Sequence, residues 1–216
     1  MVNYYAPCDK AIQSMNRENL EAFGQMKLAK WEKVNVIQTV MNVYRTSAKK
    51  ARKRYYEVAI EAYILALMMC GETSVKAHRM ANRAITLTWI DKILTQTDFV
   101  TLYRFDTEAD RKAYKLAETL EVSQDRDYEI NKALRFWSQQ IGQYALNVTD
   151  YAVIQAFQDA GIEVVQWISE HDAKTCNECY AYSDMLFPIR EIPAKPHWGC
   201  RCRLRPVLEE ESGFRR

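Results

Sequence analysis

Glycine and proline are scarce in this chain of 216 residues, and a long apolar run is lacking. There are six glycines and five prolines, and four of the prolines lie after residue 187. Because these residues end helices and build turns, their distribution predicts a helical N-terminal part and a C-terminal part in which the chain turns. The nearest candidate for a membrane span, residues 59–70, is too short and contains Glu61. We therefore expect no transmembrane helix.

An excess of either charge is also lacking. Thirty Lys and Arg residues face 28 Asp and Glu residues, and the composition of 48% hydrophobic and 27% charged residues is typical of a soluble protein. This balance argues against a protein that coats DNA. One local basic cluster, residues 49–54, carries five positive charges in six residues. It could bind phosphates or an acidic partner, or it could be a solvated helix face.

Motifs of common enzymes are missing as well: the chain has neither a glycine-rich phosphate loop nor a Gly-x-Ser-x-Gly nucleophile elbow. What it has is helical periodicity. Apolar residues recur at spacings of three and four: Val34, Ile37, Met41, Tyr44, Ala48, Ala51, Tyr55, Val58, Ala62, Leu65 and Met69. This stripe favours packing within an intramolecular bundle, or a seam with another subunit.

The remaining elements follow from the same patterns. Residues 1–8 are expected to form an extended arm, with Asp9 as a helix N-cap. Helices are expected over residues 10–71 with a break around Gly24, over 74–97, 108–121, 128–147 and 150–160, the last two being continuous or separate. Residues 98–106 are expected to form a β-prone or irregular connection, and residues 162–168 a strand. The predicted fold is mainly α, with a helical region over residues 1–134 and a small α+β module over residues 135–216.

Metal-binding residue types are concentrated in this module. Four of the six cysteines and one of the three histidines lie within residues 172–202, as Cys176, Cys179, His197, Cys200 and Cys202. A Cys-x-x-Cys turn and a second knuckle can together complete a tetrahedral zinc site. If residues 200–205 formed a straight strand, Cys200 and Cys202 would be about 6.6 Å apart along its axis, too far for both to bind one ion.

We therefore favour Cys176, Cys179, His197 and Cys200 as ligands of a structural zinc, with Cys202 as a substitute or a close neighbour. Gly199 supports this set, because glycine can adopt positive φ and let His197 and Cys200 turn toward one centre. His171 is an alternative to His197. Other interpretations are two disulfides, buried cysteines without a ligand, and a catalytic cysteine. The first residues do not resemble a secretory signal, which favours reduced thiols.

The order of residues in the C-terminal part also carries a family resemblance. Its elements are Trp167-Ile-Ser169, Asp172-x-x-Thr175-Cys176-x-x-Cys179, Met185-Leu-Phe187 and Pro196-His197-x-x-Cys200-Arg-Cys202, preceded by residues 144–150 and 161–167. Over residues 135–206 this order resembles the C-terminal module of phage head morphogenesis proteins, the Mu F-like minor head family. The chain departs from the family pattern in two places: Trp198 stands where a proline usually follows the histidine, and Ser183-Asp184 stands where a glycine is usual.

The resemblance implies a minor head protein of a tailed phage or prophage, without enzymatic activity. Such a protein is located in the virion, in the capsid interior or at the portal vertex. Its expected partners are the portal protein and the major capsid or scaffold proteins, with packaged DNA as a further candidate. Two other classes stay open. A zinc-containing nucleic-acid-binding protein would use residues 49–54 with Arg201, Arg203 and Arg205, and a metal-dependent hydrolase would depend on His197.

Overall fold

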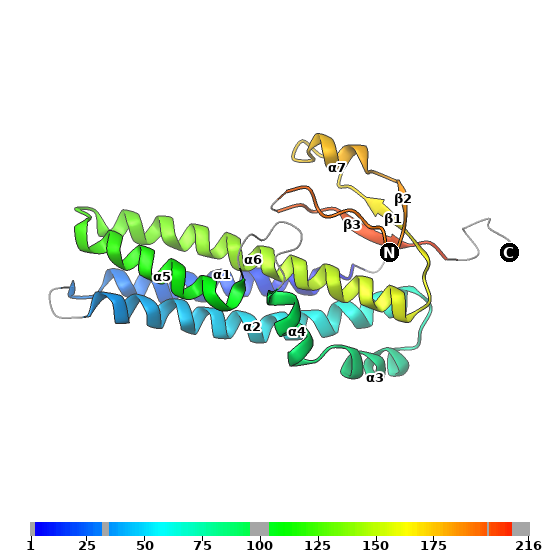
Figure 1. Ribbon diagram of the computed structural model, residues 1–216, viewed down its shortest axis with the longest axis horizontal. Coiled ribbons are helices and arrows are strands. Elements are labelled where there is room, and N and C mark those ends of the chain that lie inside the picture. Colours follow the sequence, from blue (N-terminus) through cyan, green and yellow to red (C-terminus); the bar gives the residue numbers. More distant parts are fainter. Residues whose placement is uncertain (1–2, 32–34, 96–103, 198, 209–216) are drawn as a thin grey trace.

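The computed structural model describes residues 3–31, 35–95, 104–197 and 199–208 (Figure 1). Val34 of the apolar stripe, most of the connection expected over residues 98–106, and Trp198 lie outside these ranges. The elements are, in chain order, α1 (Ala6–Lys27), α2 (Val36–Met69), α3 (Ser74–Ala84), α4 (Leu87–Thr95), α5 (Phe105–Val122), α6 (Arg126–Asp159), β1 (Val164–Ile168), α7 (Asn177–Ala181), β2 (Leu186–Pro188) and β3 (Arg203–Pro206). The predicted mainly α fold with a small C-terminal sheet is confirmed.

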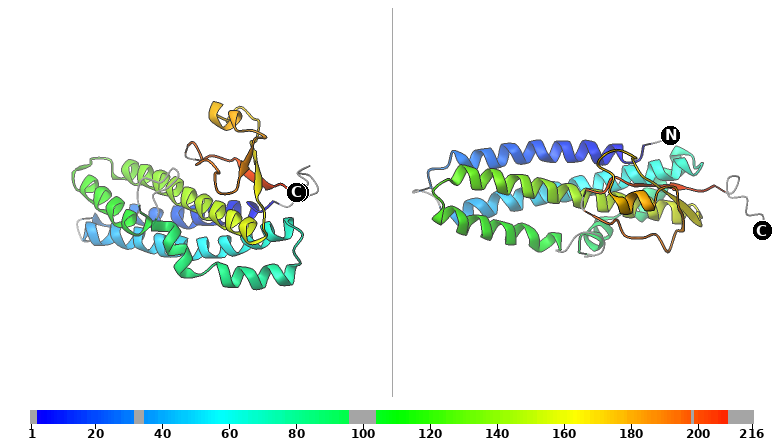
Figure 2. Two further views of the ribbon diagram at one scale, coloured as in Figure 1. Left: turned by 45° about the vertical axis from the view of Figure 1, so that its right-hand side comes forward. Right: turned by 90° about the horizontal axis from the view of Figure 1, so that it is seen from above.

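Four helices form an elongated bundle: α1, α2, α5 and α6 lie side by side, while α3 and α4 flank one side of it (Figures 1 and 2). Aromatic side chains fill the interface between α2, α5 and α6. Phe105 of α5 stacks on Trp137 of α6 at 6.3 Å between ring centroids, and it meets Tyr55 of α2 edge-on at 5.4 Å. Such pairs add to the free energy of burial and fix the relative position of the helices.

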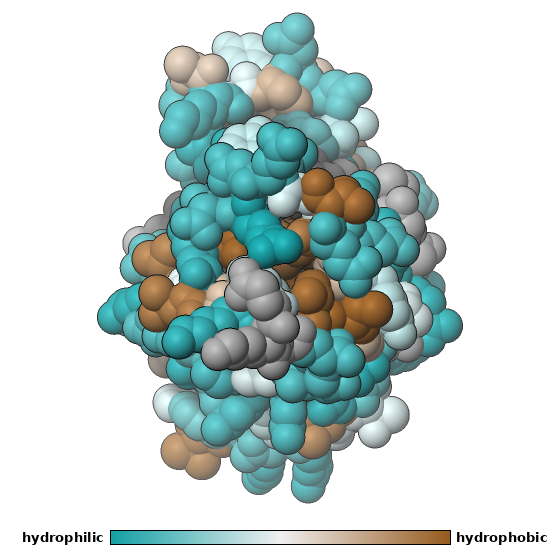
Figure 3. All heavy atoms as spheres, turned by 90° about the vertical axis from the view of Figure 1, so that its left-hand side faces the viewer, coloured by the Kyte–Doolittle hydropathy of each residue, from teal (hydrophilic) through white to brown (hydrophobic). Residues whose placement is uncertain are grey.

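The apolar stripe is largely buried within the chain, as the bundle interpretation predicts. Tyr44, Ala51, Tyr55 and Val58 are all buried between α2 and its neighbours. Ile37, in the first turn of α2 at one end of the bundle, is however 40% exposed, while Val36 beside it packs against the core. Figure 3 faces that end and shows apolar residues scattered among polar ones. The expectation that Ile37 is a core residue is therefore wrong.

Several helix boundaries differ from those expected. The first helix begins at Ala6, so residues 6–8 are helical instead of extended, and the break before α2 comes after Lys27 and not at Gly24. The helix expected over residues 74–97 is two helices. It is interrupted because Ile85 adopts an extended conformation with its side chain fully buried, and the Thr86 hydroxyl then accepts the backbone N–H of Trp89 at 3.1 Å. A hydroxyl in this position starts a new helix.

Helix α6 runs without a break for 34 residues, which confirms the continuous alternative. It begins in the bundle and ends beneath the sheet (Figure 1). The predicted division between residues 134 and 135 falls inside this helix. The N-terminal half of α6 thus packs in the bundle, while its C-terminal half contacts both the bundle, where Asp159 accepts the Tyr63 hydroxyl of α2, and the C-terminal module.

The three strands form an antiparallel sheet in the order β2-β1-β3. In the central strand, Val165 and Trp167 are buried and their neighbours are half-buried, which is the alternation of a sheet with one covered face. Trp167 pairs in register with Leu204 of β3 and meets the rings of Tyr182 and Phe187 edge-on. The strand expected over residues 200–205 begins only at Arg203. Within the described ranges, no helix combines the length and apolarity needed to cross a membrane.

Candidate metal site

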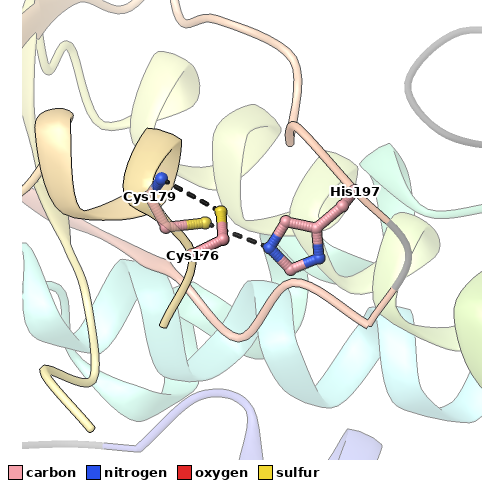
Figure 4. A group of neighbouring side chains, drawn as sticks. All are labelled: Cys176, Cys179 and His197. Carbon is pink, nitrogen blue, oxygen red and sulfur yellow. Dashed lines mark hydrogen bonds between the residues drawn. The ribbon is translucent and has the colours of Figure 1, made fainter. Parts of the chain in front are cut away.

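The first knuckle is built on the short helix α7. Cys176 is its N-cap, and its thiol accepts the backbone N–H of Cys179 at 3.3 Å. A side chain that caps a helix three residues ahead lies over the first turn, so both sulfurs are on the same side of α7. Figure 4 shows the two cysteine side chains facing the imidazole of His197, which comes from the loop between β2 and β3.

The second knuckle is a tight turn at Gly199. This residue has a φ of +69°, a conformation that favours glycine, and the backbone N–H of Cys200 donates to the carbonyl of His197 at 3.3 Å. The turn brings the side chains at positions 197 and 200 toward α7. The positive φ expected at Gly199 is therefore confirmed.

The other four predicted donors all lie close to Cys179. Its sulfur lies 3.3 Å from Nε2 of His197 and 3.5 Å from the sulfur of Cys200. The donor atoms form two overlapping groups, Cys176–Cys179–His197 and Cys179–Cys200–Cys202, and within each group all atoms lie within 4.8 Å of one another. Cys179 is the member that the two groups share. It is 2% exposed, whereas Cys176 and His197 are half-buried.

Cys200 and Cys202 are closer than a straight strand would allow. The chain becomes regular only at Arg203, so these two thiols turn toward the same centre from irregular backbone. The geometric argument against the joint participation of Cys200 and Cys202 therefore fails. Both stay candidates for the ligand that would join Cys176, Cys179 and His197.

Two polar residues that the sequence analysis did not assign to the site connect its halves. The hydroxyl of Ser169 donates to the carbonyl of Cys179 at 2.6 Å and lies 3.5 Å from the sulfur of Cys202. Asp172 accepts two hydrogen bonds from Arg201, at 2.6 and 2.8 Å, and one from the backbone N–H of Lys174. The turn before the first knuckle is thereby tied to the second one. Both residues occur in the family-like motif, which is the only signal in the sequence that could have pointed to them.

The thiols differ in acidity. The Cys200 thiol, through its hydrogen bond, lowers the pKa of Cys202 to about 5, and the same interaction raises the pKa of Cys200. Burial raises the pKa of Cys179 to about 12. Hydrogen bonds from the backbone at the start of α7 lower the pKa of Cys176. Without a cation, the sulfurs of Cys179 and Cys200 therefore hold their protons, and a bound cation would displace them.

Other histidines and cysteines stay apart from the cluster. His171, the alternative ligand, has its Nε2 at 2.7 Å from the hydroxyl of Ser183 and does not belong to either donor group. His78 lies on α3, exposed, with Nδ1 bonded to the carbonyl of Ser74. All six cysteines are free thiols, so the structure does not contain the two disulfides of the alternative interpretation.

The donor set fits a metal ion. Sulfurs that share a zinc through bonds of about 2.3 Å lie about 4 Å apart, and a thiolate and an imidazole nitrogen lie slightly closer. The observed separations of 3.5 Å between sulfurs and 3.3 Å between sulfur and nitrogen are near these values. The cluster, with Cys179, Cys200 and Cys202 buried, can thus hold a metal ion.

Comparisons with known proteins add no family to this description. No protein-family model, no curated protein and no solved structure matches the chain.

Proposed function

We propose that this chain is a minor head protein of a tailed phage or prophage, and that its cysteine cluster binds one structural zinc. The observation that carries the proposal is the convergence of the family-like residues. Ser169, which directly follows the central strand, the first knuckle and the second knuckle come from separate parts of the motif, yet they meet at Cys179.

Zinc is proposed because of the donor chemistry. Thiolates and imidazole in a tetrahedral arrangement select zinc among the common divalent ions, whereas magnesium and calcium prefer oxygen ligands. If both groups of three donors closed around one ion, four or more protein ligands would leave no open position for a reacting water, and the ion would be structural. A small three-stranded sheet buries little apolar surface, and a metal supplies the stability that such a unit lacks.

The nucleic-acid alternative is weakened by the ion pairs of the basic residues. In the 49–54 cluster, Arg52 pairs with Asp91 and Arg54 with Glu18 and Glu57, while Lys50 lies 3.5 Å from Glu18. Cations already paired with carboxylates gain little from phosphates, because the carboxylates repel the nucleic acid. Two arginines of the module are paired in the same way, Arg201 with Asp172 and Arg203 with Glu170, while Arg205 donates to the neutral amide oxygen of Gln166.

The hydrolase alternative is weakened by the small cavity at the cluster and by the ion pairs of two nearby carboxylates. The cavity beside His197 and Cys202 has a volume of only about 20 Å³. Glu170, which lines this cavity, is paired with Arg203, and Asp172 is paired with Arg201. Arg201 also holds the pKa of Asp172 well below its usual range, which makes it a weak base.

Elemental analysis of protein purified without added metal tests the zinc. We expect one zinc per chain. A folded, metal-free protein in which all six thiols react with a thiol reagent would contradict the assignment.

The head role is tested by assembly. The chain would be expressed with the portal, scaffold and major capsid proteins encoded by the same phage or prophage, and procapsids would be isolated by sedimentation. We expect a few copies per procapsid, and co-purification with portal subunits in the absence of capsid protein. Procapsids that form normally while the chain stays entirely in the unassembled fraction would contradict the proposal.

A further inference from the structure

The loop that carries His197 is attached to helix α6 at two points. On one side of His197, the ammonium of Lys195 lies 2.8 and 3.0 Å from the two carboxylate oxygens of Asp150. On the other side, the backbone N–H of Gly199 donates to Oε1 of Gln143 at 2.7 Å. Gln143 and Asp150 are seven residues apart on one helix and therefore lie on the same face, two turns from each other. We call this pair of attachments the α6 clamp.

Both attachments are buried and well supplied with partners. Asp150 is 3% exposed and Lys195 is 7% exposed. Gln143 is 2% exposed, and its amide nitrogen donates to Asn147 at 2.9 Å, so the orientation that presents Oε1 to Gly199 is fixed. A buried amide with both ends bonded is held in one rotamer.

The N-terminal residues complete the clamp. The hydroxyl of Tyr5 donates to the carboxylate of Asp150, and its ring lies under two cations, Lys195 at 5.3 Å and Arg203 at 5.5 Å. Tyr5 is the N-cap of α1 and is 4% exposed. Three parts of the chain, the start of α1, the middle of α6 and the His197 loop, therefore meet at one carboxylate.

Stability alone is a poor explanation for this arrangement. Desolvation of two buried charges offsets most of their attraction, so a buried ion pair often contributes little net stability compared with apolar residues of similar volume. What it does provide is a defined geometry, because each charge must stay close to its partner. The residues held in place here are Lys195 and Gly199; the predicted ligand His197 lies between them in the chain, and Gly199 directly precedes the predicted ligand Cys200.

We propose that Gln143 and Asp150 are positioning residues of the metal site, and that the α6 clamp sets the affinity of the cluster for its ion. This inference rests on the proposed zinc site and extends it: the site is completed by a bundle helix and is not a property of the C-terminal module alone. Because coupling is reciprocal, a bound ion also holds the loop on α6. Partners that hold metal ligands in place are commonly worth tenfold or more in metal affinity.

The test compares Gln143→Met with Gln155→Met, a matched control. Both glutamines lie on α6 and bond to a residue four positions ahead, but Gln155 is half-buried and bonds to Asp159. The measured quantity is the dissociation constant for Zn²⁺, from competition with a chromophoric chelator, in the full-length chain. We expect Gln143→Met to raise it about tenfold and Gln155→Met to leave it unchanged. Circular dichroism reports whether the helices are intact.

Lys195 and Asp150 are tested as a pair, because either single replacement leaves a buried charge that could unfold the loop. In the double variant Lys195→Met with Asp150→Leu no charge is stranded, and we expect weaker Zn²⁺ binding with the helical signal preserved. Hydrogen exchange at the Gly199 amide of the metal-free protein gives a second readout, slow in the wild type and faster in Gln143→Met.

The outcomes separate the two proposals. If the wild type does not bind Zn²⁺, the zinc assignment itself is wrong. If the wild type binds Zn²⁺ and both the Gln143 variant and the double variant bind it equally well while folded, the zinc site stands and the clamp has no role in it. A loss of helical signal that parallels the loss of affinity would show a merely structural effect and would also overturn the inference.

Discussion

Replacing Cys179 by serine is the sharpest test of the cluster, because this residue is common to both donor groups. The substitution keeps the size and polarity of the side chain but removes the thiolate. Zinc binding at a site that exists only in the folded state contributes on the order of 10 kcal/mol to folding. Divided among four ligands, this is about 2.5 kcal/mol for each, or roughly a 70-fold loss of affinity.

The structure makes that figure a lower bound for Cys179. Its sulfur touches both His197 and Cys200, and its carbonyl accepts the Ser169 hydroxyl. Removal of the sulfur separates the two knuckles, so we expect Cys179→Ser to lose its zinc and residues 167–205 to unfold, while α1, α2 and α5 stay helical. Limited proteolysis would then cleave the C-terminal part, and circular dichroism would retain most of the helical signal.

Three further cysteine variants are needed to interpret the result for Cys179→Ser. Cys70→Ser is the control, since Cys70 is the C-cap of α2 and lies outside the cluster. It should bind zinc as the wild type does. Cys200→Ser and Cys202→Ser identify the fourth ligand, and we expect the larger loss for Cys200→Ser. If Cys179→Ser kept one zinc at wild-type affinity, or lost it while the module resisted proteolysis, the reasoning would be refuted.

Three other predictions concern the bundle, the basic cluster and the loss of stability at acidic pH. Val58→Lys should lower the free energy of unfolding by roughly 4 kcal/mol, because Val58 is 3% exposed and the charge would be stranded, whereas Ile37→Lys should cost less than about 1 kcal/mol; equal melting temperatures would contradict this. Binding to duplex DNA should be weak even at about 50 mM salt, and an affinity that falls steeply toward about 200 mM would show unpaired cations instead. Arg201 depresses the pKa of Asp172, so this pair stabilises the fold above about pH 4, and the contribution is lost as the pH falls through the folded pKa. The melting temperature of Asp172→Asn should therefore fall less between about pH 4 and 2 than that of the wild type, and identical curves of melting temperature against pH would refute this.

Periodicity in the sequence was sufficient to predict most of the helices, because burial of one face repeats along each of them. It was insufficient at helix ends, because single contacts determine where a helix begins and ends. The break at Ile85 depends on one fully buried side chain and one threonine cap. Ile37 continues the stripe in sequence but is 40% exposed, and its neighbour Val36 packs against the core instead. Neither fact is contained in the spacing of apolar residues.

The donors of the site could be predicted from residue types, because thiols and imidazole are rare and were clustered. The residues that hold these donors in place could not be predicted. Gln143 and Asp150 belong to a helix whose pattern gave no reason to separate them from other polar residues, and their partners are 56 and 45 positions away. The backbone N–H of Gly199 carries no side-chain signal at all. Long-range hydrogen bonds of this kind become visible only when the chain is folded.

The same contacts bear on how the module is stabilised. Its strands have five, three and four residues, and sheets this small are marginal without further packing. A metal ion and the surface of α6 would supply the missing free energy together, and the His197 loop is the element common to both. Metal removal should therefore affect α6 as well as the knuckles: with the loop released, Asp150 would lose Lys195 and be exposed to water near Tyr5. Hydrogen exchange along α6, compared with and without chelator, should show faster exchange around residues 143–150 than around residues 126–135. Uniform protection of α6 in both states would mean that the bundle stands independently of the metal site.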